Sequence, residues 1–298
     1  MASLDLEEIF KCKDLTSSSV DVYKTRLKKL NDNKPIKNLN FLMDKETVSN
    51  KVKDLKPNTQ RNYYIAICSI LKCMITNKRA NKKLIKIYED YSKILDDYNI
   101  KLKDQTAKTE SEEKNWMSNE EVNQIYEDLK KNHEGSQDAF QRFLVLSLYV
   151  LNPPRRNKDY ALMKVVSVYN DKLSKEFNYL DLKNKKFVFN NYKTAKKYNE
   201  QMVGVPEDLM VIINGYLKKY KVKTNEYLLM NLKTGEPLLR NNDMTLFLNR
   251  IFKKKVGSSM LRKLYLTDKY GGKIDQLETD AKMMGTSTGT IQTNYVKK

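Results

Sequence analysis

The chain has 298 residues, enough for two domains, and its 56 Lys and Arg against 37 Asp and Glu give a formal charge of +19. With 31% charged and 40% hydrophobic residues it has the composition of a protein with buried cores, and no apolar run approaches the roughly 18 residues of a membrane span. The first residues lack a basic segment followed by an apolar one. We therefore expect an intracellular protein without a secretory signal or a membrane partner.

The cysteines and the single histidine argue against metal chemistry. Cys12, Cys68 and Cys73 lack the spacing of a metal finger, and reduced thiols are the simplest interpretation. His133 lies in a polar stretch and is expected to be solvated. One histidine nearly excludes a His-based metal site or a His-driven triad, and we predict no cofactor.

The charge of +19 indicates a polyanionic partner, and nucleic acid is the usual one. The alternative is an anionic membrane surface, which normally requires a basic amphipathic helix or a lipidation motif, and neither is evident. The abundance of Lys, Asn, Tyr and Ile would suit an AT-rich virus or mobile element.

Residues 1–100 carry helical periodicity and no strand pattern, which predicts a small all-helical domain. The expected helices are 20–30, 41–55 and 59–76, the last with an N-cap at Asn58 or Thr59. Its apolar side, with Ile67 and Ile70, is expected to be core. On the opposite side three polar residues are candidates for DNA contacts, with a solvated face as the equal alternative: Lys56, Gln60 and Arg61.

Residues 101–115 contain two apolar side chains in fifteen residues, and we predict that they are a linker. Ser118 and Glu121 then form a capping-box pattern, in which the Ser118 hydroxyl accepts from the Glu121 amide and the carboxylate reaches back. A second domain is therefore predicted over residues 116–298.

The second domain alternates between helical and strand patterns. An apolar helix over 140–151 is stopped by Asn152-Pro153-Pro154, and short strands are predicted at 178–182, 186–193 and 201–205. From Pro206 the helical pattern returns almost to the end. The fold class is therefore predicted as mostly α with a small antiparallel β-sheet, an α+β architecture.

Cleaving DNA without a metal requires a nucleophile, cations for the non-bridging phosphate oxygens and an acid for the leaving oxygen. A tyrosine phenol can attack phosphorus if cations stabilise its phenolate, and arginine hydrogen-bonds two phosphate oxygens at once. The chain offers such groups in a suggestive order: Arg155 and Arg156 at a helix start, Lys193 at a predicted hairpin turn, Arg262 four residues into Ser258–Tyr265, Gly285-Thr286-Ser287, and Tyr295.

In these residues the chain resembles the tyrosine recombinases, the phage-integrase family. That family presents an Arg opening a helix, a Lys in a β-hairpin, a His-x-x-Arg motif and a Gly-His-Ser segment before the nucleophilic Tyr. Here Ser259 and Arg262 stand at the two ends of the His-x-x-Arg motif, and Tyr295 follows Thr286 by nine residues, the family's usual spacing. The N-terminal helices look like the family's core-binding (SAM-like) domain, so the resemblance covers nearly the whole chain.

The resemblance implies a site-specific recombinase or integrase that acts on double-stranded DNA as a tetramer assembled on two sites, wherever that DNA lies. Tyr295 would form a 3′-phosphotyrosyl link and release a 5′-hydroxyl, which later reverses the step without ATP or Mg²⁺. Arg156 and Arg262 would stabilise the charge on phosphorus, and Lys193 would protonate the 5′ oxygen. The two domains would clamp the duplex.

Two details remain open within the resemblance. Arg156 fits the first arginine better than Arg155, because the family places an acid three residues later and Asp159 satisfies this only for Arg156. Arg155 remains a phosphate contact or the alternative catalytic arginine. Ser259 and Thr286 replace both family histidines; each can hydrogen-bond a phosphate oxygen, but neither titrates near neutral pH, and Lys263 would add a cation.

Three rival interpretations follow from the same residues. A type IB topoisomerase uses the same chemistry without synapsis, and the missing histidines suit a DNA-binding descendant that has lost catalysis. Taken singly, Tyr295 would be a surface tyrosine, Lys193 part of a solvated lysine run, and Arg155 or Arg156 a salt-bridge partner of Asp159.

Overall fold

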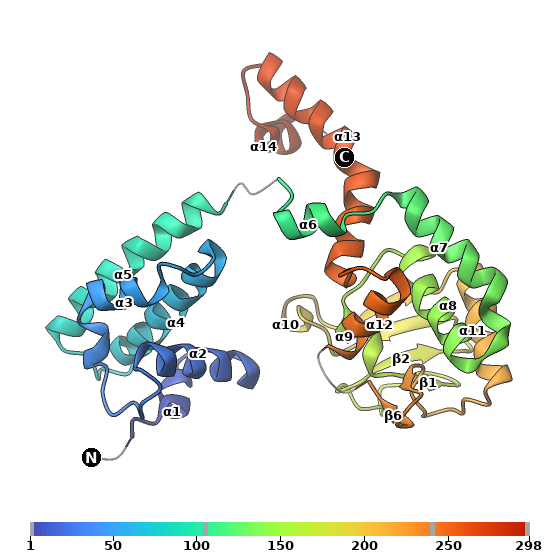
Figure 1. Cartoon of the computed structure of the whole chain (residues 1–298), viewed down its shortest axis with the longest axis horizontal. Coiled ribbons are helices and arrows are strands. Elements are labelled where there is room, and N and C mark those ends of the chain that lie inside the picture. The colour runs from blue at the N-terminus through green and yellow to red at the C-terminus, as the bar shows by residue number, and fades with distance from the viewer. Residues whose placement is uncertain (1–2, 104–106, 239–241, 296–298) are drawn as a thin grey trace. The chain divides into compact units, whose positions relative to one another are not determined.

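The computed structural model describes residues 3–103, 107–238 and 242–295, and the chain divides into two compact units, Met1–Ala107 and Lys108–Lys298 (Figure 1). The division falls inside the predicted linker. Among the described residues no helix is long and apolar enough to cross a bilayer.

All the regular elements in the described residues of unit 1 are helices. Its elements are α1 (Leu6–Phe10), α2 (Ser17–Leu30), η1 (Asn40–Leu42), α3 (Lys45–Val52), α4 (Pro57–Thr76) and α5 (Lys82–Lys101). As predicted, Ile67 and Ile70 of α4 are fully buried. The predicted N-cap of α4 is wrong by two residues or more: Lys56 is the N-cap and Pro57 the first helical residue, where its missing N–H costs nothing.

A disulfide joins Cys12, just after α1, to Cys73 of α4, with their Cα atoms 5.5 Å apart. The expectation of three reduced thiols is therefore wrong for this pair and holds for Cys68, which is free and buried. The two half-cystines lie 61 positions apart in sequence, and only the packing of α1 on α4 brings them within bonding range.

Unit 2 begins with a helix where the sequence predicts linker. Helix α6 (Glu110–Asn115) begins with a capping box at Thr109. At its other end the buried Asn115 side chain accepts a hydrogen bond from the Lys255 backbone N–H at 2.9 Å. Residues 110–115 are therefore packed into unit 2. The capping box predicted at Ser118 is confirmed: Ser118 donates to Glu121, and the Glu121 amide donates to the Ser118 hydroxyl.

The remaining elements of unit 2 place strands between helices, which confirms the α+β class. In chain order they are α7 (Asn119–Asn132), η2 (His133–Gly135), α8 (Gln137–Val150), α9 (Asn157–Ala161), β1 (Met163–Val166), β2 (Asn178–Asp181), β3 (Lys186–Phe189), α10 (Ala195–Tyr198), β4 (Gln201–Gly204), α11 (Glu207–Lys219), β5 (Met230–Asn231), β6 (Glu236–Pro237), α12 (Asp243–Phe252), α13 (Ser258–Met283), α14 (Thr288–Thr290) and η3 (Ile291–Tyr295).

The main sheet has the order β1-β2-β3-β4 and is mixed. Strands β2, β3 and β4 are antiparallel neighbours, as predicted, whereas β1 pairs with β2 in parallel, with Met163 opposite Asn178. The expectation of a purely antiparallel sheet is therefore wrong. Residues 163–166, with Met163, Val165 and Val166 apolar, follow directly on the helical pattern, and so short a run fits a helix or a strand equally well.

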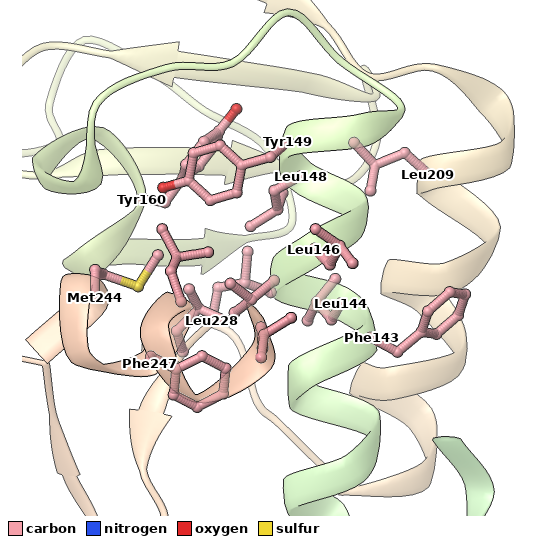
Figure 2. Packing of buried hydrophobic residues seen from close by; sticks show 14 of the residues in the cluster. Phe143, Leu144, Leu146, Leu148, Tyr149, Tyr160, Leu209, Leu228, Met244 and Phe247 are labelled. Atoms are coloured by element: carbon pink, nitrogen blue, oxygen red, sulfur yellow. The ribbon is translucent and has the colours of Figure 1, made fainter. Parts of the chain in front are cut away.

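The core of unit 2 surrounds α8, which is buried on most of its circumference. Figure 2 shows Leu144, Leu146 and Leu148 of α8 between Leu209 of α11 and the α12 residues Met244 and Phe247. Because α8 is fixed on these sides, the loop that follows it has a fixed starting point. His133, predicted to be solvated, is only partly exposed: its ring packs against Phe140 and Phe143, with centroids 4.5 and 4.7 Å away.

Candidate active site

A cavity of about 620 Å³ opens in unit 2 beside the start of α9. Its walls come from the loop after α8, from the β3–β4 connection, from β4 and from the first turns of α13. The lining residues are Asn152, Pro153, Pro154, Arg155, Arg156, Asp159, Tyr192, Thr194, Tyr198, Gln201, Val203 and Arg262. The cavity thus contains three of the arginines singled out by the sequence.

Asn157 explains why residues a hundred positions apart meet at this cavity. Its backbone N–H donates to the Ser258 hydroxyl at 3.2 Å, and its side-chain amide donates to the Thr245 hydroxyl at 2.8 Å. The first residue of α9 is thereby tied to the first residue of α13 and to α12. Arg156, the N-cap residue of α9, and Arg262, one turn into α13, consequently face the same space.

Arg155 is held by several contacts at once. Its Nε donates to the Asp159 carboxylate at 2.8 Å, and its Nη2 donates to the Gln201 side chain at 3.0 Å. The guanidinium also stacks 3.7 Å from the ring centroid of Phe189. Arg155 therefore forms a salt bridge with Asp159, which is the structural role considered for it in the sequence analysis.

The charge in the cavity is unbalanced. Asp159 is 2% exposed, and its Oδ1 has no hydrogen-bond partner among the described residues. Burial raises the pKa of Asp159, opposed by the positive charges of Arg155, Arg156 and Arg262. Burial, followed by the neighbouring Arg156, lowers the pKa of Arg262, which still remains protonated near neutral pH. Three guanidinium groups thus surround one carboxylate, an arrangement suited to an anion such as phosphate.

Asn178 is a positioning residue that the sequence reasoning missed. Its amide donates to the backbone carbonyls of Asp159 at 2.9 Å and Asn191 at 3.1 Å. Its carbonyl accepts from the backbone N–H groups of Asn190 and Asn191 at 2.9 and 2.8 Å. One side chain therefore locks the end of β3 to α9. The available signal was an Asn at the first position of a predicted strand, followed by the large residues Tyr179 and Leu180.

The turn after β3 contributes Tyr192, Thr194 and Tyr198 to the cavity wall, but Lys193, although adjacent, is exposed and is not among the described lining residues. Strand β3 ends at Phe189, four residues before Lys193. The predicted general acid is therefore near the cavity in sequence, on a turn outside the regular hairpin.

The C-terminal candidates lie elsewhere on unit 2. Gly285, at φ +65°, ends α13 in the left-handed region, and Ser287 caps α14 by accepting from the Thr290 amide. Tyr295 is 62% exposed. Neither Thr286 nor Tyr295 belongs to the described lining of the cavity.

Two further α13 candidates do not contribute to the lining in the described residues. Ser259 is exposed, and Lys263 forms an ion pair with Glu112 of α6. The structure therefore brings together Arg155, Arg156 and Arg262 but leaves the predicted nucleophile and both histidine replacements outside.

In unit 1 the three candidate DNA contacts have different environments. Lys56 is exposed at the start of α4. Gln60 donates to the backbone carbonyls of Lys53 and Leu55, at 3.0 and 2.6 Å, and Arg61 donates to Asn99 at 2.6 Å. Gln60 and Arg61 thus have structural partners that a nucleic acid would have to share.

Within the described residues no group of three or more His, Cys, Asp or Glu side chains is placed to hold a metal ion.

Comparison with known proteins gives a distant structural match. No protein-family model matches the chain, and no curated protein matches it. Among solved structures it is similar to the crystal structure of XerA recombinase, with 14% sequence identity, a TM-score of 0.37, and coverage of 96% of this chain and 90% of that one.

Proposed function

We propose that this chain cleaves and rejoins DNA strands as a tyrosine-type site-specific recombinase. The observation that carries the proposal is the convergence of Arg156 and Arg262 on one cavity, beside an Arg155 already neutralised by Asp159. Arg156 and Arg262 have no carboxylate partner of their own in the part of the chain that the structure describes, and two such guanidinium groups suit the two non-bridging oxygens of a phosphodiester. The formal charge of +19 supports a polyanionic substrate.

In the proposed reaction the Tyr295 hydroxyl releases its proton to water, its oxygen bonds to phosphorus, and the bond from phosphorus to the 5′ oxygen breaks. Arg156 and Arg262 neutralise the charge on the phosphoryl oxygens, and Lys193 gives its proton to the 5′ oxygen. Ser259 and Thr286 would donate hydrogen bonds to the phosphate. Attack by a 5′-hydroxyl on the phosphotyrosyl bond reverses the step, so the energy of the phosphodiester is conserved.

The reaction also requires movement. Tyr295 is exposed and outside the described lining of the cavity, so the segment that carries Thr286 and Tyr295 has to approach the arginines, or a second protomer has to supply its own. Either rearrangement would occur when the protein assembles on DNA. In this proposal it assembles as a tetramer on two sites, with residues 1–100 as the core-binding domain.

Covalent trapping tests the proposal. The full chain is incubated in EDTA with a pool of duplexes that carry a nick beside a randomised 30-base-pair core, so that a short released strand diffuses away and the intermediate accumulates. We expect a protein–DNA adduct on a denaturing gel, with mass spectrometry placing the phosphate on Tyr295. Tyr295→Phe should abolish the adduct and retain DNA binding.

A second candidate is a recombinase-derived DNA-binding protein without catalysis. It is favoured by the placement of Tyr295 away from the arginines and by Ser259 and Thr286 at the histidine positions. The same experiment separates the two: salt-sensitive binding without any adduct would support the inactive protein. An adduct accompanied by relaxation of supercoiled plasmid, without joining of two duplexes, would instead support a topoisomerase-like enzyme.

A further inference from the structure

Tyr198 shares the cavity with the arginines, although the proposed mechanism assigns it no role. It is the last residue of α10, the short helix inside the β3–β4 connection. Figure 1 shows α10 at the same end of unit 2 as α9. The side chain lines the cavity together with Arg156 and Arg262, and the residue is 54% exposed. About half of the Tyr198 surface therefore faces solvent at the edge of the cavity that the arginines line.

The backbone that carries this ring is anchored. The Tyr192 hydroxyl donates to the Asn199 carbonyl at 2.6 Å, which closes the turn on both sides of α10. Asn199 also donates its N–H to the Ala195 carbonyl at 2.8 Å, and Asn178 holds the start of the turn. The ring is thus presented by a fixed turn, so a ligand would meet it with little loss of backbone entropy.

The surroundings of the ring indicate what it contacts. Lys197 Nζ lies 5.2 Å from the Tyr198 ring centroid, which adds positive charge next to an exposed aromatic face. Cations that hold a phosphate, next to an aromatic face, form the pair of contacts by which proteins hold single-stranded nucleic acid. An unstacked base can lie on such a ring while its phosphate lies on the arginines.

We propose that Tyr198 stacks on a nucleobase adjacent to the phosphate bound by Arg156 and Arg262. This inference rests on the proposed function, because it takes DNA as the ligand of the cavity. A base can stack on a protein ring only after it has left its neighbour in the duplex. The chain therefore binds best where the base next to the held phosphate is already unstacked, at a mismatch or a single-stranded step.

The experiment measures binding and base stacking with 2-aminopurine duplexes that carry a central mismatch. The proteins compared are the original chain and the variants Tyr198→Ala, Tyr198→Phe, Arg156→Ala and Tyr270→Ala. Tyr270→Ala is the matched control, because Tyr270 is 40% exposed on α13 and does not belong to the described lining of the cavity. Affinity is measured over a range of salt concentrations, and the fluorescence reports whether the base has left the stack.

We expect Tyr198→Ala to bind the mismatched duplex about five- to 150-fold more weakly, the range found when one base–aromatic stack is removed. The affinities of Tyr198→Phe and Tyr270→Ala should stay within about twofold of that of the original chain, because both variants keep an aromatic ring at position 198. The salt slope of Tyr198→Ala should equal that of the original chain, because the substitution removes no charge, whereas Arg156→Ala should lower the slope.

The outcomes separate the inference from the proposed function. If the original chain shows no salt-dependent DNA binding, the proposed function fails. If it binds, and Arg156→Ala weakens binding, but Tyr198→Ala keeps the original affinity and fluorescence change, the stacking role alone is overturned. If Tyr198→Phe loses as much affinity as Tyr198→Ala, the hydroxyl makes the contact and the stacking role is again overturned.

Discussion

Replacing Asn178 by Ala tests whether one side chain fixes the geometry of the cavity. The substitution removes four hydrogen bonds, of which the one to the Asp159 carbonyl is fully buried and the other three are partly buried. A buried carbonyl left without a donor costs about 2 kcal/mol, and groups that water can reach cost about 0.5 kcal/mol each. The expected loss in the free energy of unfolding of unit 2 is therefore about 3 to 4 kcal/mol.

Urea denaturation followed by Trp116 fluorescence measures this loss, because the only tryptophan of the chain packs against the core of unit 2. Asn191→Ala is the matched control: its side chain makes a single exposed hydrogen bond, to the Glu176 carbonyl, and should cost less than about 1 kcal/mol. Trypsin should also cleave after Lys193 and Lys197 faster in Asn178→Ala, because the turn loses its anchor.

A loss below about 1 kcal/mol for Asn178→Ala, with tryptic cleavage at the original rate, would refute this reasoning. It would mean that the turn keeps its place through Tyr192 alone. The same result would weaken the claim that α9 and the turn form one rigid wall of the cavity.

Three further predictions concern other parts of the chain. Reducing the disulfide between Cys12 and Cys73, which closes a segment of 61 positions, should destabilise unit 1 by about 4 kcal/mol in a comparison of urea midpoints with and without dithiothreitol. Burial raises the pKa of Cys68 to about 11, so its alkylation by iodoacetamide in the folded protein should be slow at pH 8 and rise about tenfold per pH unit up to pH 10; equal rates at pH 7 and pH 9 would contradict this. Arg155→Ala should destabilise unit 2 by about 3 to 5 kcal/mol, because it leaves Asp159 buried without its salt-bridge partner. Arg156→Ala should lower DNA affinity without lowering the unfolding midpoint, because it removes a charge that repels Arg262.

The parts of the fold that the sequence predicts are those set by neighbouring residues. The capping box at Ser118 and the stop of α8 before Pro153 depend on contacts within a few positions. The antiparallel strands 186–189 and 201–204 are neighbours in sequence, joined by residues 190–200. The α+β class follows from these local patterns, because they separate helical stretches from a small group of strands.

The features that the sequence does not reveal depend on distant contacts. Strand β1 is recognisable only through its parallel pairing with β2, and Cys12 becomes a half-cystine only because α1 packs on α4. His133 was predicted to be solvated from its polar neighbours in sequence, but Phe140 and Phe143 lie against it in space. In each case the local pattern fits two states and the tertiary contact decides between them.

The candidate site divides in the same way. The sequence identifies the arginines by residue type and order, but the pairing of Arg155 with Asp159 and the contacts of Asn157 and Asn178 require the folded chain. Tyr198 was hidden among nineteen tyrosines, and the only signal available was its place in the predicted hairpin connection.

The motif residues differ in how much of their identity the fold itself explains. Gly285 is required because α13 ends at a positive φ, and Ser287 caps α14, so both would be favoured there in a protein of any function. Arg156 and Arg262 have no such explanation. Burial, followed by the charge of Arg156, lowers the pKa of Arg262, and among the described residues the buried Asp159 carboxylate beside them is already paired with Arg155. Holding these two like charges together costs the fold stability, and a negatively charged ligand would offset that cost. In the proposed function the ligand is a phosphodiester.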